Sequence, residues 1–268
     1  MTDDLTEDVP EGEGSDEVEA YRMTLLEHLI ELRDRLVKAG FAMVVALGIT
    51  LPFGSEIFDF LIQPTHEHFA TGSGFIYTEV GEKFITDLKV GLFAALFLAS
   101  PFLFAQMWGF VAPGLYKHER RMVVPFAVLS SGFFILGAAF CYYGILPWGM
   151  KFFLSFATGD IAAQIKVSAY LGFVTKFLVG MGLVFQMPLA IFFLARLGIV
   201  DAAGLKSFRK YAVVLSFLVS SFLTPPDPGT QVALALPMIV LYEIGILTAR
   251  LWGKPKAVVE APDAAEAT

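Results

Sequence analysis

The sequence predicts an all-α integral membrane protein with six transmembrane helices, both termini in the cytoplasm, and a concave bundle whose last two spans are short. The chain is 56% hydrophobic and only 17% charged, with a mean hydropathy of +0.66, which is typical of membrane proteins and rare in soluble domains. Its apolar residues fall into six runs. When these runs are threaded through a membrane, most basic residues gather on one side.

Charge separates two tails from the membrane domain, residues 21–252. Residues 1–20 hold nine acids and no base, and residues 257–268 hold three more acids, so the body between them carries a net charge of +5 although the whole chain carries −7. The tails, residues 1–20 and 253–268, lack aromatic residues and apolar periodicity, and we expect them to be disordered. Residues 1–20 also lack the basic start and apolar stretch of a cleavable signal peptide.

The first expected element is an amphipathic helix over residues 24–36. Thr24 and Glu27, three residues apart, form a capping box that predicts a helix start at Thr24. Leucines at positions 25, 29, 32 and 36 form one apolar stripe, while Glu27, Glu31 and Arg35 share another face. Taken alone, these charges are those of an interfacial helix, in which a Glu31–Arg35 pair contributes a few tenths of a kcal/mol.

Six apolar runs follow, and crossing the hydrocarbon core of a bilayer takes about 20 apolar residues. Four runs are long enough or nearly so, whereas the last two hold only 13 and 16 residues. The predicted spans cover residues 37–53, 90–111, 122–146, 171–197, 211–223 and 232–247.

Prolines shape these spans. They interrupt the runs at positions 101, 188 and 237, and because each removes a helical hydrogen bond, we expect bent helices in a concave bundle. Three more prolines lie in the link LTPPDPGTQ between the two short runs, where the chain has to turn sharply. The link therefore predicts a short hairpin, whose mismatch with the bilayer would be met by local thinning or by leaning on neighbouring helices.

The distribution of basic residues predicts the orientation. With the N-terminus in the cytoplasm, the inner segments carry 14 lysines and arginines and the outer segments carry five, and all eight arginines lie inside. Positively charged residues favour the cytoplasmic side. The sequence thus predicts that both termini are cytoplasmic.

Patterns that would indicate catalysis or metal binding are weak. His66-Glu67-His68 has the wrong spacing for a helical zinc motif, and the TGSG stretch at residues 71–74 is not a nucleophile elbow. The single cysteine, Cys141, lies in an apolar run, where packing is its expected role. We therefore expect no enzyme activity, no metal and no cofactor.

Polar residues within the apolar runs are few. Glu243 lies near the inner end of the last run, and an acid at such a depth either serves function or pairs with a nearby arginine such as Arg250. Gln186, just ahead of Pro188, is expected to bond across helices in the simplest case. A proton-coupled transporter would need a chain of buried acids, which the sequence does not contain.

A second cytoplasmic feature is VAPGLYKHERR at residues 111–121. Pro113-Gly114 predicts a turn, and Glu119 falls in the first turn of the third span. Taken alone, Glu119 is an acid favoured by a helix dipole. Together with Glu31, it makes a second carboxylate among basic residues on the inner face.

Three motifs carry a family resemblance: HLIELRDRL at residues 28–36, GFVAPGLYKHERR at 109–121 and LTPPDPGTQ at 223–231. Their sequences and spacing resemble the TatC family, the multispanning subunit of the twin-arginine protein translocase. The resemblance covers about residues 24–252. It implies a receptor in the bacterial cytoplasmic (inner) membrane that recognises signal peptides with consecutive arginines on folded cargo. It also implies self-association, single-span TatA/TatB-type partners, and a proton gradient as the energy source.

The resemblance also assigns site residues. It implies that Glu31 and Glu119 bind the signal peptide, helped by Phe110. We expect nearby arginines to orient the two carboxylates or to hold them ionised, namely Arg33, Arg120 and Arg121. A polar site for a partner's membrane helix matches Thr224, Gln231, Ser221 and Gln186, with turn capping as the alternative for Thr224. Other positions that match sensitive sites of the family are Pro64 in the first outer loop, Tyr142 in the third span and Asp227 in the outer turn.

One residue departs from the family pattern, because many relatives carry a glutamate where this chain has Gln186. An amide can form hydrogen bonds but does not titrate, so we expect a polar contact there and not a charge. The alternative functions are a six-span transporter or channel, which would need midplane acids and internal symmetry, and an intramembrane hydrolase, which would need a nucleophile and base.

Overall fold

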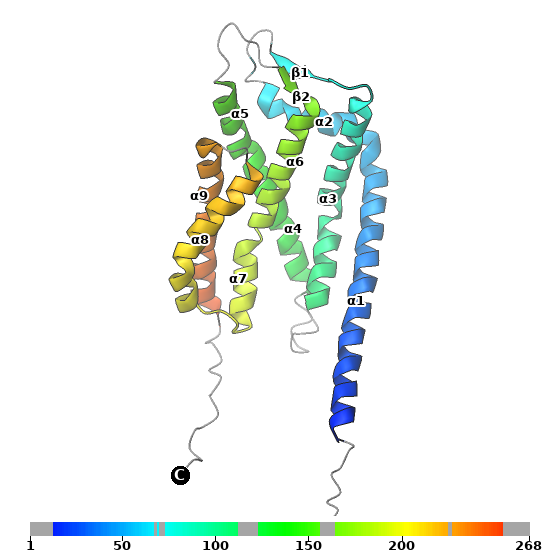
Figure 1. Ribbon diagram of the computed structural model, residues 1–268, viewed down its shortest axis with the longest axis vertical. Helices are drawn as coiled ribbons and strands as arrows, with labels where there is room; N and C mark the ends of the chain where they lie inside the picture. Colours follow the sequence, from blue (N-terminus) through cyan, green and yellow to red (C-terminus); the bar gives the residue numbers. More distant parts are fainter. Residues whose placement is uncertain are drawn as a thin grey trace, which may run out of the picture.

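The computed structural model is built almost entirely of helices (Figure 1). It describes residues 13–66, 69, 73–111, 123–155, 164–224 and 227–253, with side chains from residue 26 onward except at 111 and 123. In chain order the elements are α1 (Glu13–Thr50), η1 (Leu51–Phe53), α2 (Gly54–His66), β1 (Gly74–Ile76), α3 (Glu82–Val111), α4 (Val123–Phe140), the π-helical η4 (Cys141–Ile145), α5 (Leu146–Leu154), β2 (Gln164–Lys166), α6 (Val167–Val184), α7 (Met187–Arg196), α8 (Ala202–Leu223) and α9 (Pro228–Trp252).

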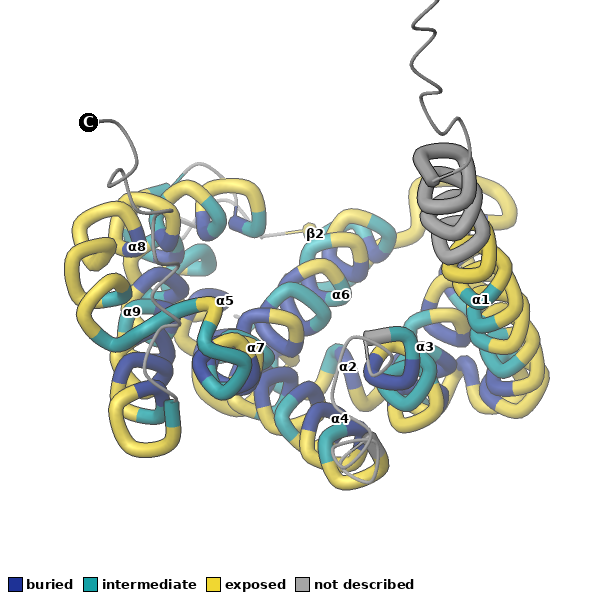
Figure 2. The backbone as a smooth tube through the Cα atoms, turned by 90° about the horizontal axis from the view of Figure 1, so that it is seen from below, coloured by how far each residue is buried: buried dark blue, intermediate teal, exposed yellow. Residues whose placement is uncertain are grey.

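The helices form an open, curved row, with α1 and α8 at its opposite ends (Figure 2). Along this row α1 packs on α3, α3 on α4 and α4 on α6, while α7 and α8 both pack on α9. A groove of about 530 Å³ runs between α3 and α6. The concave all-α bundle predicted from the sequence is confirmed.

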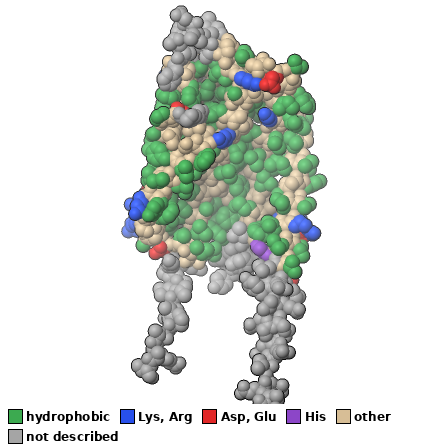
Figure 3. Space-filling model, in the orientation of Figure 1, with side chains coloured by type: hydrophobic (Ala, Val, Ile, Leu, Met, Phe, Trp, Pro, Cys, Tyr) green, Lys and Arg blue, Asp and Glu red, His purple; other side chains and the backbone are tan. Residues whose placement is uncertain are grey.

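Hydrophobic side chains cover most of the face shown in Figure 3, and its described charged residues lie toward its upper and lower parts. Within the described residues, five helical stretches are long and apolar enough to cross a membrane, namely Leu26–His66, Glu82–Phe110, Val124–Leu154, Val167–Arg196 and Pro228–Trp252. The fifth predicted span, residues 211–223, lies in α8, whose first turns carry Lys206, Arg209 and Lys210. These charges shorten its apolar part, so six spans stay a prediction.

The first helix differs from the expectation. α1 begins at Glu13 and continues to Thr50, so the expected amphipathic helix at 24–36 and most of the first span form a single helix. The predicted start at Thr24 is therefore wrong, and so is the disorder expected for residues 13–20. Because no proline occurs between Glu13 and Thr50, nothing in this stretch forces the helix to stop, and Pro52 coincides with its end.

A cap closes the end of the bundle that lies opposite the start of α1 (Figure 1). It contains α2 and the parallel pair of strands β1 and β2, in which Gly74 lies opposite Gln164 and Ile76 opposite Lys166. Pro64 was expected in a loop but lies inside α2. His66 ends the same helix, while Glu67 and His68 are outside the described residues. In the described part of the chain no cluster of three His, Cys, Asp or Glu side chains is arranged to hold a metal.

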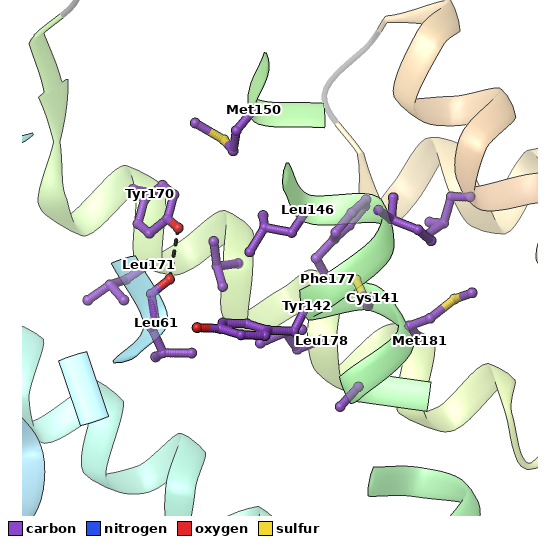
Figure 4. Packing of buried hydrophobic residues seen from close by; sticks show 14 of the residues in the cluster. Leu61, Cys141, Tyr142, Leu146, Met150, Tyr170, Leu171, Phe177, Leu178 and Met181 are labelled. Atoms are coloured by element: carbon purple, nitrogen blue, oxygen red, sulfur yellow. Dashed lines mark hydrogen bonds between the residues drawn. The ribbon is translucent and has the colours of Figure 1, made fainter. Parts of the chain in front are cut away.

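The main core lies where η4 meets α2 and α6 (Figure 4). Leu146, Leu171 and Phe177 are each 1% exposed and pack together there. Cys141 belongs to the same cluster and is fully buried, as its expected packing role requires.

The fourth predicted span is broken in two. α6 ends at Val184 and α7 begins at Met187, with Phe185 and Gln186 between them. Pro188 is within the first turn of α7, where a missing N–H costs nothing. The other two prolines expected to interrupt spans, Pro101 and Pro237, lie inside α3 and α9, which continue through them.

Candidate functional site

Glu31 lies on α1, where this helix faces the end of α3. Its Oε1 accepts two hydrogen bonds from the Arg35 guanidinium, at 2.9 Å from Nε and 2.6 Å from Nη2. The Glu31 side chain is 33% exposed and that of Arg35 is 26% exposed. The carboxylate is therefore partly screened from water yet open to a ligand.

The two residues at the end of α3 contact α1 directly. Phe110 stacks on His28, with 4.3 Å between ring centroids. Beside it, a Cβ added to Gly109 would lie only 2.9 Å from Cζ of Arg35, so the guanidinium rests against bare backbone. Phe110, predicted at this site, thus lies next to the Glu31–Arg35 pair, and Gly109 is a neighbour that the sequence analysis missed.

Of the three arginines predicted to act near the carboxylates, the structure describes only Arg33. Arg33 bonds to Asp34, at 2.8 Å from Nη2 to Oδ1, and its side chain is 70% exposed. The guanidinium bonded to Glu31 is therefore that of Arg35 and not that of Arg33, while a part for Arg33 in peptide binding stays a prediction. Glu119, Arg120 and Arg121 lie outside the described residues, so their roles stay predictions.

Above Arg35, the seam between α1 and α3 opens into an apolar groove of about 730 Å³. It begins at Val37 and Lys38 and continues along α1 to Ile49, facing Leu98 and Phe102 of α3. The groove thus joins the Glu31 region to the apolar middle of the protein.

The turn between α8 and α9 holds the second group of predicted residues. Asp227 caps α9, with Oδ1 accepting from the Thr230 amide at 2.7 Å and Oδ2 accepting from the Thr230 hydroxyl. Thr224 ends α8, and its hydroxyl donates to the Ser220 carbonyl at 2.9 Å. The capping alternative for Thr224 is therefore confirmed, which leaves its partner role as a prediction.

Two further polar residues of this predicted partner site differ in their surroundings. Gln231 donates from Nε2 to the Phe217 carbonyl at 3.1 Å and so ties α9 to α8. Ser221, at the end of α8, is exposed. Of the three polar residues that the predicted partner site places at this turn, Ser221 is therefore exposed, Gln231 is half-buried and Thr224 is buried.

Gln186 lies away from this turn, at the break between α6 and α7. Its Nε2 donates to the Ser130 carbonyl of α4 at 2.8 Å, and Trp108 of α3 donates to the Ser130 hydroxyl at 2.7 Å. The cross-helix bond expected of Gln186 is confirmed. An amide fits this position because its N–H₂ group donates a proton that an ionised carboxylate lacks.

Pro64 and Tyr142, which were predicted as separate sites, both affect the hydrogen bonding of the Phe60 carbonyl. Proline has no N–H, so Pro64 deprives the Phe60 carbonyl of its usual donor four residues on. The Tyr142 hydroxyl donates to that carbonyl, and the Tyr142 ring stacks on that of Phe60 with 4.5 Å between centroids. Next to them, the Tyr170 hydroxyl donates to the Leu61 carbonyl at 2.9 Å (Figure 4).

Glu243 pairs with an arginine, though not with the predicted one. Its Oε2 lies 2.6 Å from Nη2 of Arg209 on α8, and Arg250, suggested by its position two turns further along α9, is not that partner. The partner comes from the other arm of the hairpin, which the sequence alone does not align.

Glu82, in the cap, was not singled out from the sequence. It is 6% exposed, and its carboxylate accepts from the Thr78 amide at 2.7 Å and from the Ser168 amide at 3.1 Å. Nearby, Lys166 binds Glu79 at 2.6 Å, a hydrogen bond that raises the pKa of the lysine. These contacts tie the segment before α3 to the start of α6. An acid in the first turn of a helix was the available signal.

Comparisons with known proteins show the family to which the chain belongs. The family model for the Sec-independent protein translocase protein (TatC) matches residues 27–237. A TatC protein from Magnetococcus marinus is 42% identical over 242 residues, covering 90% of this chain and 89% of the relative. The TatC protein of Escherichia coli K12 is 37% identical over 228 residues, covering 85% and 88%.

Solved structures give the same result. A crystal structure of the twin-arginine translocase receptor TatC in DDM superposes with a TM-score of 0.77 at 34% identity, covering 84% of this chain and all of the other. A second crystal structure of that receptor gives a TM-score of 0.73 at 33% identity, with coverages of 83% and 97%. The chain therefore belongs to the TatC family of Sec-independent protein translocase proteins.

Proposed function

We propose that this translocase component is the receptor for twin-arginine signal peptides, and that Glu31 and Glu119 are the carboxylates that read the two arginines. The observation that carries the proposal is the half-exposed Glu31 carboxylate at the α1–α3 seam, beside Phe110. The segment that contains Glu119 leaves α3 immediately after this contact. A guanidinium offers a planar set of donors to a carboxylate, whereas lysine offers a point charge.

Typical free energies indicate how much the arginines and the apolar residues of the signal peptide each contribute to binding. An exposed ion pair contributes about 0–1 kcal/mol, while loss of one partner from a desolvated pair costs about 2–5 kcal/mol. Apolar surface removed from water contributes about 25 cal/mol per Å². The apolar stretch of the signal would therefore supply most of the affinity, and the groove above Arg35 supports this because it continues from the arginine-reading face. The arginines supply the selection.

The same proposal includes assembly. Single-span TatA/TatB-type subunits would dock at the polar edge formed by Ser221, Thr224 and Gln231, with a further contact near Gln186, and the chain would self-associate in a multimeric receptor complex. The exposed Ser221 and the Gln231–Phe217 bond support a polar edge at a fixed position. We place the protein in the bacterial inner membrane with six spans and both termini in the cytoplasm, and with the proton gradient driving transport.

Peptide binding tests the receptor role. We expect the purified chain to bind a twin-arginine signal peptide more tightly than its Lys-Lys variant, and both Glu31→Ala and Glu119→Ala to weaken binding and abolish this advantage. Glu27→Ala, one turn earlier on α1 and exposed, is the matched control. If the preference survives both test substitutions, the two acids are surface charges and the arginine reader lies elsewhere.

A further inference from the structure

The two oxygens of the Glu31 carboxylate differ in the hydrogen bonds that they accept. Both N–H groups that Arg35 directs at it go to Oε1, at 2.9 and 2.6 Å. Within the part of the chain that the structure describes, no hydrogen bond reaches Oε2. As far as the described residues go, one oxygen is thus occupied and the other is open to a ligand.

Arg35 holds this position because of what lies behind it. Its guanidinium rests on the backbone of Gly109, where an added Cβ would come within 2.9 Å of Cζ and 3.2 Å of Nη2. Contacts this short force one of the groups to move. Any residue other than glycine at position 109 would therefore displace the Arg35 guanidinium from its present position.

We infer that Arg35, seated on Gly109, is a positioning residue for arginine recognition: it fixes Glu31 through Oε1 and presents Oε2 to an arginine of the signal peptide. This inference rests on the proposed receptor function. A glutamate side chain is flexible in solution, and fixing it beforehand spares the ligand that entropic cost. A carboxylate with one fixed open edge also favours a planar guanidinium over a rotating ammonium group.

The other groups around Glu31 support this assignment. Arg33 is engaged by Asp34, and His28 is stacked on Phe110. An ordinary ion pair between residues four apart on a helix needs nothing from a neighbouring helix. Here α3 supplies Gly109 at the point where the Arg35 guanidinium touches it. This contact distinguishes a positioning role for Arg35 from an ordinary surface ion pair.

Four substitutions test the inference by the ratio of twin-arginine to Lys-Lys peptide affinity. We expect Gly109→Ala and Arg35→Gln each to lower this ratio about fivefold, the order expected when one long side chain has to be ordered on binding. Arg35→Lys keeps the charge without the planar donors and should recover only part of the ratio. Gly40→Ala, on α1 with no atom within 4 Å of the added Cβ, should leave it unchanged.

Gly109→Ala is the decisive variant because it moves the Arg35 guanidinium and keeps its charge. Tighter binding of the twin-arginine peptide in Arg35→Gln would make Arg35 a competitor for Glu31 and overturn the inference. So would full recovery in Arg35→Lys, or a loss in Arg35→Gln with none in Gly109→Ala, since charge alone would then suffice. Thermal unfolding of each variant checks folding, and if Gly109→Ala fails to fold, the two Arg35 variants decide.

Glu31→Gln separates this inference from the proposed function. If that variant keeps the wild-type preference, the receptor site itself is misplaced. If it loses the preference while Gly109→Ala and Arg35→Gln retain it, the receptor site stands and only the positioning role fails.

Discussion

At the residue scale, the structure links positions that are far apart in the sequence. Pro64 removes the donor that the Phe60 carbonyl would meet inside α2, and Tyr142, from η4, supplies a hydroxyl in its place. A carbonyl screened from water costs about 1–3 kcal/mol when it lacks a donor, and this one is partly screened, with the Tyr142 ring stacked on that of Phe60. The two residues therefore form one unit, in which the tyrosine compensates for the proline.

Tyr142→Phe should destabilise the protein by about 1–3 kcal/mol, because the Phe60 carbonyl then loses its donor. Pro64→Ala restores a backbone N–H, so we expect Pro64→Ala/Tyr142→Phe to be more stable than Tyr142→Phe alone. Unfolding in detergent measures the resulting double-mutant cycle. Tyr143→Phe, at a neighbouring residue that is 71% exposed, is the control. Strictly additive effects would contradict the link.

At the element scale, caps define the short hairpin of α8 and α9. Each of its helices begins with an aspartate: Asp201 accepts from the Gly204 amide at 2.9 Å, and Asp227 accepts from that of Thr230. The two caps lie at opposite ends of the hairpin, because α8 runs from Ala202 to Leu223. This makes them a matched pair for separating stability from docking.

Asp201→Ala and Asp227→Ala should each lower the stability of the protein by about 0.5–2 kcal/mol, as expected for loss of a helix N-cap. Only Asp227→Ala, next to the proposed partner edge, should also weaken association with single-span partner subunits. Co-purification of such a subunit with each variant, together with thermal unfolding, measures both effects. If both variants associate equally well with the partner subunit, Asp227 is only a helix cap and has no role in docking.

At the scale of the whole molecule, the protein is an open row of helices tied at one end by a cap. Glu82 and the Glu79–Lys166 pair join the segment before α3 to β2 and α6. At the opposite end, which carries Glu31, the described contacts join neighbouring helices: His28 stacks on Phe110 and Arg209 pairs with Glu243. The protein is a component of a translocase and not an enzyme.

The number of spans is testable with single cysteines in a Cys141→Ser background. We expect a membrane-impermeant maleimide to label Ser155→Cys and Ser221→Cys from outside intact cells, and Ser207→Cys only after the membrane is opened. All three serines are exposed. If Ser207→Cys and Ser221→Cys react from the same side, α8 does not cross and the six-span topology is wrong.

The fold class, the family and some helix ends of this protein follow from its sequence alone. The apolar runs predict an all-helical membrane protein, because a chain in lipid has to satisfy its backbone hydrogen bonds within itself. The motifs predict the family, and the breaks at Pro188 and at the α8–α9 turn follow from proline chemistry. These are local properties, which neighbouring residues encode.

Only the tertiary structure decided which side chains meet. It kept the predicted Glu31–Arg35 pair, paired Glu243 with Arg209 instead of Arg250, and joined Gly109 to Arg35 and Tyr142 to Phe60. The start of α1 was also predicted wrongly. A capping-box pattern such as that of Thr24 and Glu27 can occur inside a longer helix, where it does not mark the first turn. Apart from the local Glu31–Arg35 pair, these contacts depend on how helices distant in sequence are aligned, and packing between helices sets that alignment.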